Sequence, residues 1–110
     1  MRALFLALAL VPLIGCNSGT VLSPSAIIVP DAVTVTVGSA QVFTVQNATV
    51  TGFDLSIDTQ DWSECITVDG TFSQANSIRL IARSVCRGYV HVTARIGDRR
   101  SPIVAVMAVK

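Results

Sequence analysis

Apolar and polar side chains alternate through most of this chain, and this pattern constrains its fold more than any other feature of the sequence. In AVTVTV (32–37) every second residue is valine, and in YVHVTARI (89–96) every second residue is apolar. Side chains two residues apart lie on the same face of a β-strand, so each segment predicts a strand with one buried face. β-Branched residues favour this conformation, and no segment after residue 25 has the 3.6-residue period of an amphipathic helix. The chain is therefore predicted to be all-β.

The rest of the chain divides into further short strands separated by turn-forming dipeptides. Gly38-Ser39, Asp69-Gly70 and Gly97-Asp98 interrupt the apolar pattern with residues that tolerate tight turns. The predicted strands comprise residues 32–37, 40–46, 53–58, 66–68, 78–83, 89–96 and 102–109. The last of these, PIVAVMAV, is apolar at consecutive positions, which predicts a strand covered on both faces. About seven short strands at even spacing favour a single antiparallel β-sandwich.

The N-terminal residues have the pattern of a secretion signal. A single charge, Arg2, is followed by an apolar run over residues 3–14 that contains no polar side chain. A helix needs ~20 residues to cross the hydrocarbon core of a bilayer, so this run is too short for a membrane anchor. Its length and its basic start instead predict a signal peptide that is removed from the mature protein.

The end of this run, LIGC (13–16), resembles the lipobox of bacterial lipoproteins. The resemblance implies that residues 1–15 are a lipoprotein signal peptide, that Cys16 receives a diacylglyceryl group and that the new amino terminus is acylated. Several acyl chains together anchor a protein stably to a membrane. Asn17 stands where such proteins carry an Asp that retains them in the inner membrane, which implies the outer membrane as the destination. The alternative is an ordinary signal peptide in which Cys16 has no role.

A small polar stretch separates this motif from the strands. Residues 16–25 include Asn, Ser, Gly, Thr and Pro, a composition that is typical of a flexible tether. The mature chain is therefore predicted to comprise a lipidated Cys16, a tether over residues 16–25 and one β-sandwich domain over residues 26–110.

The charged residues are few and unevenly distributed. The chain has eight Lys and Arg against seven Asp and Glu, and loss of Arg2 with the signal brings the formal charge to zero, which does not favour a nucleic-acid partner. Six of the seven acids precede residue 70, whereas every base other than Arg2 follows it. We expect the two halves of the sandwich to interleave, so that these charges pair or are solvated. A basic face that contacts lipid phosphate or an acidic partner is the alternative.

Two cysteines, Cys65 and Cys86, remain once Cys16 carries lipid. An even number of thiols in an oxidising compartment predicts one disulfide between them. A bridge to a partner protein is the alternative. A metal site is not expected, because the chain has no C-x-x-C motif and only one His.

A second resemblance covers about residues 26–109. The chain is similar to bacterial immunoglobulin-like domains in the order of its strands and in the segments VTVTVGSAQVFTV (33–45), a central Trp62, VDG (68–70) and GYVHVTARIGD (88–98). This resemblance implies an Ig-like sandwich, in which Gly88 allows a close approach of two segments. The cysteine pair, and Ser63-Glu64-Cys65 after the tryptophan, depart from the pattern of the family.

Catalytic apparatus is not visible in the sequence. None of the spacings that mark a nucleophilic, zinc or phosphate site is present, so neither an enzyme nor a cofactor is expected. Asp54, Ser56 and Asp58 have the spacing of a calcium loop, but Thr59 and Cys65 stand where that loop needs Gly and Glu.

A binding patch is the stronger candidate for a functional site. Tyr89, His91 and Arg95 alternate with the apolar residues of one predicted strand, so they share its outward face. An aromatic side chain near an Arg is a common composition of binding hot spots. Trp62 is instead expected in the core, as is typical of the central tryptophan of a sandwich.

These features favour a lipid-anchored protein of the cell envelope that acts as a non-catalytic interaction module and binds a protein partner. Two alternatives remain open. One is a structural subunit of an envelope assembly, such as a secretion channel, a pilus or a phage-encoded envelope factor. The other is a module that binds cell wall or carbohydrate, for which the six aromatic residues of the chain are few.

Overall fold

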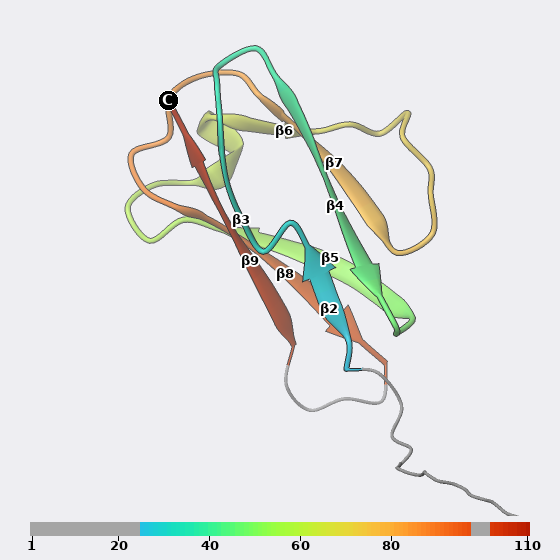
Figure 1. Ribbon diagram of the computed structural model, residues 1–110. Coiled ribbons are helices and arrows are strands. Elements are labelled where there is room, and N and C mark those ends of the chain that lie inside the picture. The colour runs from blue at the N-terminus through green and yellow to red at the C-terminus, as the bar shows by residue number, and fades with distance from the viewer. Residues whose placement is uncertain (1–24, 98–101) are drawn as a thin grey trace, which may run out of the picture.

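Two β-sheets packed face to face make up the described part of the protein (Figure 1). The computed structural model describes residues 25–97 and 102–110. One sheet has the strand order β2-β4-β7-β6 and the other β3-β9-β8-β5. The strands are β2 Ile27–Val29, β3 Ala32–Val35, β4 Ala40–Gln46, β5 Val50–Ser56, β6 Ile66–Val68, β7 Ser77–Ala82, β8 Val90–Ile96 and β9 Ile103–Val109. The predicted all-β sandwich is confirmed.

Eight strands are described where the sequence predicts about seven. β4 and β6 have the predicted bounds, and five further strands agree with their predicted segments within a few residues. The additional strand, β2, has the sequence IIV, in which apolar residues follow one another. A three-residue apolar segment carries no period, so only its pairing with β4 makes it a strand.

The first two strands belong to different sheets. β2 pairs antiparallel with β4, and after Pro30 and Asp31 the chain continues as β3, which pairs in parallel with β9. The prediction of a purely antiparallel sandwich is wrong at this pair. The chain passes from β2 to β3 without reversing its direction, so the start of the domain runs alongside its last strand (Figure 1).

The core lies between the sheets and is made largely of aliphatic side chains. Val90, Val92 and Ala94, at alternate positions of β8, are fully buried, as the sequence pattern predicts. Phe43 from the first sheet and Met107 from the second are also enclosed. No polar or charged side chain is buried among the described residues. The packing of the two sheets therefore rests on apolar burial, which stabilises by roughly 25 cal/mol per Å².

One face of β9 is open to solvent, so the prediction of cover on both faces is wrong. Ala105, Met107 and Val109 are buried, whereas Val104 on the opposite face is 43% exposed. β3 and β8 flank β9 within the sheet, but no described segment forms a further layer over its outer face. The apolar run therefore belongs to a strand in the middle of a sheet, not to one enclosed between two layers.

Ion pairs join the acidic first half of the chain to the basic second half, as expected. Among the described residues the pairs are Asp69–Arg79 at 3.3 Å, Glu64–Arg87 at 3.8 Å and Asp54–Arg95 at 2.9 Å. Exposed pairs of this kind add little to stability. They do neutralise three arginines that would otherwise contribute to a basic face.

We expect Phe43→Ala to lower the free energy of unfolding by about 3–5 kcal/mol, because it removes a fully buried ring and leaves a cavity. Val104→Ala is the matched control on the exposed face of β9 and should change this free energy by less than about 0.5 kcal/mol. Denaturation in guanidinium chloride, followed by circular dichroism, measures both. Equal effects of the two substitutions would contradict this assignment of core and surface.

Candidate functional site

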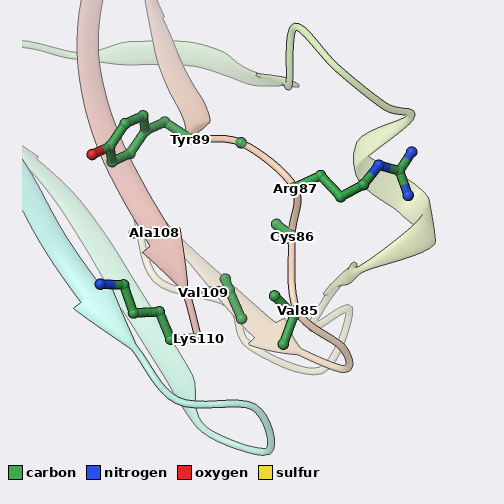
Figure 2. Close-up of a pocket in the computed structure, with 8 residues that line it drawn as sticks. Val85, Cys86, Arg87, Tyr89, Ala108, Val109 and Lys110 are labelled. Atoms are coloured by element: carbon green, nitrogen blue, oxygen red, sulfur yellow. The ribbon is translucent and has the colours of Figure 1, made fainter.

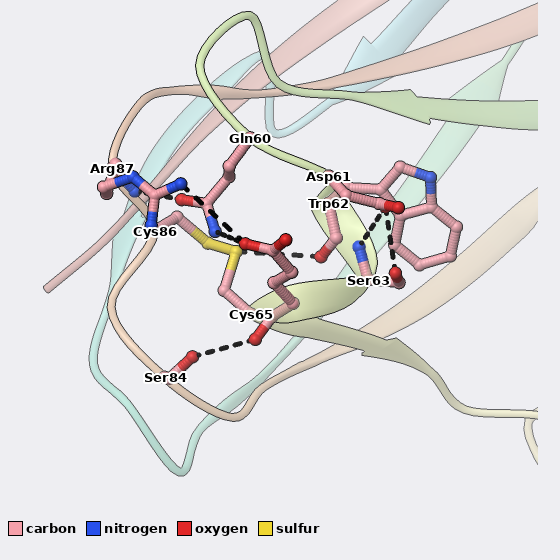
Figure 3. A network of polar contacts seen from close by, with 9 residues as sticks. Gln60, Asp61, Trp62, Ser63, Cys65, Ser84, Cys86 and Arg87 are labelled. Carbon is pink, nitrogen blue, oxygen red and sulfur yellow. Dashed lines mark hydrogen bonds and ion pairs between the residues drawn. A yellow bond between two sulfur atoms is a disulfide. The ribbon is translucent and has the colours of Figure 1, made fainter.

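A disulfide between Cys65 and Cys86 joins two segments at one end of the sandwich (Figure 3). The sulfur atoms are 2.09 Å apart and the Cα atoms 5.5 Å apart. Cys65 directly precedes β6 in one sheet, and Cys86 lies in the connection that leads to β8 in the other. Both residues are buried. The predicted pairing within the chain is confirmed, and it leaves neither thiol free for a bridge to a partner.

A short 3-10 helix, η3 (Trp62–Glu64), leads into the first of these cysteines. Asp61 caps η3, because its carboxylate accepts hydrogen bonds from the Ser63 backbone N–H at 3.0 Å and from the Ser63 Oγ at 2.9 Å. These bonds favour the charged carboxylate and hold the pKa of Asp61 below its usual value of 3.8. Trp62 is half-buried and packs against the core from η3, so it lies at the periphery of the core and not within it as predicted. The segment before the disulfide therefore has a fixed local structure.

The connection between β7 and β8, residues 83–89, which we term the tied loop, is held against η3 and the segment before it. Ser84 Oγ donates a hydrogen bond to the Glu64 carbonyl at 3.1 Å. On the other side of the disulfide, the Arg87 backbone N–H donates to Gln60 Oε1 at 2.5 Å. Figure 3 shows both bonds flanking the sulfur bridge. Three attachments therefore fix the backbone of a connection that would otherwise be a surface loop.

The tied loop exposes two large apolar side chains. Val85 is 59% exposed and Tyr89 is 62% exposed, the highest values among the large hydrophobic residues of the described chain. Arg87 lies between them, with its guanidinium 3.8 Å from the Glu64 carboxylate. Apolar groups on an ordered backbone bind a partner at a small cost in loop entropy. An exposed aromatic residue of this kind is typical of hot spots in protein interfaces.

An open pocket of about 250 Å³ lies beside the tied loop (Figure 2). Val85 and Tyr89 line it from the loop, and Val109 and Lys110 line it from the end of the second sheet. Arg87 contributes to the rim, but its guanidinium points away from the tyrosine and the lysine (Figure 2). Val85, Tyr89, Ala108 and Val109 give the pocket a largely apolar lining, which favours contact with an apolar group.

The predicted patch of Tyr89, His91 and Arg95 is only partly assembled. All three alternate with buried residues and so point outward, as expected. Tyr89 and Arg95 are six residues apart on an extended chain, however, which separates them by roughly 20 Å. His91, between them, is half-buried, and Arg95 is paired with Asp54. Tyr89 lines one pocket with Val85 of the tied loop, whereas Arg95 lies near the other end of β8.

Sequence reasoning missed Val85 and the order of the tied loop. The segment RSVCRG (83–88) has no period and predicts only a connection between strands. The available signal was Cys86, because a disulfide in the middle of a connection fixes the residues on either side of it. Which side chains then stay exposed depends on packing against η3, and no local pattern encodes that packing.

Other expected features fall outside this region. Cys16, the signal peptide over residues 1–15 and the tether before Ser25 lie outside the described residues. Within residues 25–97 and 102–110, no group of three His, Cys, Asp or Glu side chains is placed to hold a metal ion. In those same two ranges, no helix has the length and apolar character needed to span a membrane.

Replacement of both bridge cysteines, Cys65→Ala with Cys86→Ala, should lower the free energy of unfolding by about 3 kcal/mol. The bridge links residues that are 21 positions apart, and in the chain-entropy model it restricts the unfolded chain accordingly. Urea denaturation of the variant and of the native protein, both without reductant, measures the difference. A loss below about 1 kcal/mol would show that the bridge is a minor source of stability.

Acid should destabilise the protein in part through Asp61. Its folded-state pKa is lowered, so this group contributes stability above its unfolded pKa and loses that contribution as the pH falls through the folded value. Asp61→Asn should therefore reduce the slope of unfolding free energy against pH below about pH 4 and leave the slope above about pH 5 unchanged. Ser63→Ala, which removes one of the two hydrogen bonds, should have a smaller effect of the same sign. Urea denaturation at a series of pH values measures both slopes, and an unchanged slope below pH ~4 in the Asp61 variant would contradict the capping role.

Comparison of the chain with known protein families finds no matching family model, and comparison with curated proteins finds no match. The residues of the chain and their arrangement are therefore the basis on which a function is proposed.

Proposed function

We propose that this protein is a lipid-anchored component of the bacterial cell envelope, held at the outer membrane, which binds a protein partner through the tied loop and catalyses no reaction. The observation that carries the binding role is the exposure of Val85 and Tyr89 on a loop that a disulfide holds in place. The anchor rests on the lipobox pattern LIGC (13–16), with Cys16 as the lipidated residue.

The path of the chain supports a role in display. Ile27, near the start of the described domain, pairs with Gln46 at one end of the first sheet, and the tied loop lies at the opposite end of the sandwich (Figure 1). The tether between Cys16 and the domain is about nine residues long and reaches at most ~30 Å. With the N-terminal end of the sandwich tethered to the membrane, the tied loop at the opposite end is accessible to a partner.

We further propose that the sandwich is Ig-like. The order β2-β4-β7-β6 corresponds to strands A-B-E-D of that fold, and β9-β8-β5 corresponds to G-F-C. The cysteine positions differ from those of antibody domains, which join strands B and F. Here the bridge lies at one end of the sandwich, where it ties the connection before β8, and both cysteines join a core that is otherwise largely aliphatic. Ig-like sandwiches are common among cell-surface domains, which agrees with a binding role.

Site-specific photo-crosslinking in the cells that produce the protein tests the binding role. A photoreactive amino acid in place of Tyr89 of the full chain should capture one dominant partner. The same group in place of Thr67, which is exposed on β6 in the other sheet, should not. The double variant Val85→Ala with Tyr89→Ala should weaken the affinity for that partner by about 10- to 100-fold, as expected for a hot spot. Circular dichroism verifies that each variant is folded.

A separate measurement addresses the anchor. The intact mass of protein extracted from membranes should include acyl chains, and Cys16→Ser should abolish both the added mass and the retention in the membrane fraction. An unmodified Cys16 would reject the anchor and leave the crosslinking result valid. Equal crosslinking from the Tyr89 and Thr67 positions would reject the tied loop as the binding surface and favour a subunit that is enclosed in an assembly.

A further inference from the structure

The second sheet ends on an edge strand, β5, that is long for an edge. β5 has seven residues, whereas the other edge strands have three or four. Among the described strands it pairs only with β8, on one side. An unpaired edge presents backbone N–H and C=O groups to which another strand can add. β5 is therefore the edge of this sandwich with the most backbone available for pairing.

The inward side of β5 is incompletely covered. Phe53 and Leu55 pack against the core but remain half-buried. Their partners across the pairing with β8, Ala94 and Val92, are fully buried. The difference arises because β8 has a strand on both sides and β5 has one on a single side. A further strand beyond β5 would cover the two larger side chains.

On the outer face, Arg95 reaches across β5 toward the same edge. Arg95 stands opposite Gly52, and its Nη2 lies in the space that a side chain at Gly52 would occupy. Its Nε is 2.9 Å from the carboxylate of Asp54. Glycine at position 52 therefore permits a cation to lie at the open edge, beside an acid of the edge strand.

We propose that two copies of this protein pair through their β5 strands, antiparallel about a two-fold axis at Phe53. In this register Phe53 faces itself across the axis, and Gly52 stands opposite Asp54 of the second copy. Residues that oppose one another share a face of the sheet, so that aspartate lies beside Arg95, which already contacts its own Asp54. The two-fold axis repeats the contact, and two arginines and two aspartates form one cluster with balanced charge.

The charges select this register over its neighbours. An axis at Asp54 places two aspartates directly opposite each other, which is unfavourable. An axis at Leu55 sets Asp54 against Ser56 and moves the second copy's acid away from Arg95. Of these three registers, only the axis at Phe53 places the second copy's acid beside Arg95, and this self-complementarity favours a second copy of the chain as the occupant.

The proposed contact between the two β5 strands involves few residues, so its strength depends on the proposed lipid anchor. A register shift between Val50 and Gly52 disturbs the start of β5 and shortens its regular part. A pairing of this length is weak between free chains, but chains held in one membrane meet at a high effective concentration. The dimer is therefore expected in membranes and rests there on the proposed lipid anchor. Antiparallel pairing points the two N-terminal ends in opposite directions, so the dimer lies with its strands along the membrane, within reach of both tethers, and one tied loop lies at each end of the dimer.

Cysteine crosslinking of the full chain in isolated membranes tests the register. Phe53→Cys should form a disulfide-linked dimer on non-reducing electrophoresis, because directly opposed residues have Cβ atoms about 4.5–5.5 Å apart. Leu55→Cys is the matched control on the same face, and in this register its two copies are roughly 13 Å apart, beyond the reach of a disulfide. Peptide mapping should place the bridge at position 53. Absence of dimer from Phe53→Cys, or equal dimer from both variants, would overturn the proposal.

Charge reversal in the Phe53→Cys background tests the ionic cluster. Asp54→Lys should reduce the crosslinked dimer at least tenfold, and the double exchange Asp54→Lys with Arg95→Glu should restore it. Asp58→Lys, which changes an exposed acid outside β5, should leave the dimer unchanged. Failure of the double exchange to restore dimer in a folded variant would reject the cluster. The intact mass and the Tyr89 crosslinks are measured independently, so failure of the dimer is distinguishable from failure of the proposed function.

Discussion

Burial of one face of each strand between the two sheets is the constraint on which the rest of this structure depends. A domain of this size buries only about 60% of its unfolded surface, so a few enclosed side chains carry much of the stability. Phe43, Leu80 and Met107 are among those that are fully enclosed, and they come from both sheets. A shift of one residue in any pairing would turn such side chains to solvent, so the core also fixes the register of the strands. The loops and the edge strands lie around this core, and their side chains vary in exposure and charge.

The disulfide adds an order that the apolar core does not supply. Connections between strands are usually the most mobile parts of a sandwich, because few apolar contacts hold them. Here Cys86 fixes the middle of such a connection to Cys65, and hydrogen bonds on both sides complete the attachment. Val85 and Tyr89 are exposed despite this order. The interactions that order the loop thus lie within the domain, and in the proposed binding role the two exposed side chains need little further ordering to bind a partner.

The pairing of charges also depends on which segments the fold brings together. The fold brings segments of the acidic first half beside segments of the basic second half, and three ion pairs form between them. These pairs leave a surface of low net charge on which exposed valines and one tyrosine are the prominent features. In the proposed interactions, recognition depends on apolar contact at the tied loop and on paired backbone at β5, where charge selects the register.

By itself the sequence determined the strands, because the period of two is a property of each segment alone. It also predicted the pairing of Cys65 with Cys86, on the expectation that Cys16 carries lipid, and the structure confirmed this bridge over one to a partner. Only the tertiary structure decided that β2 is a strand, that β3 runs parallel to β9 and that Val104 is exposed. It also decided that Tyr89 belongs with Val85 and that Arg95 lies over Gly52. These features depend on which segments meet in space, and contacts between residues far apart in the chain leave no periodic trace in the sequence.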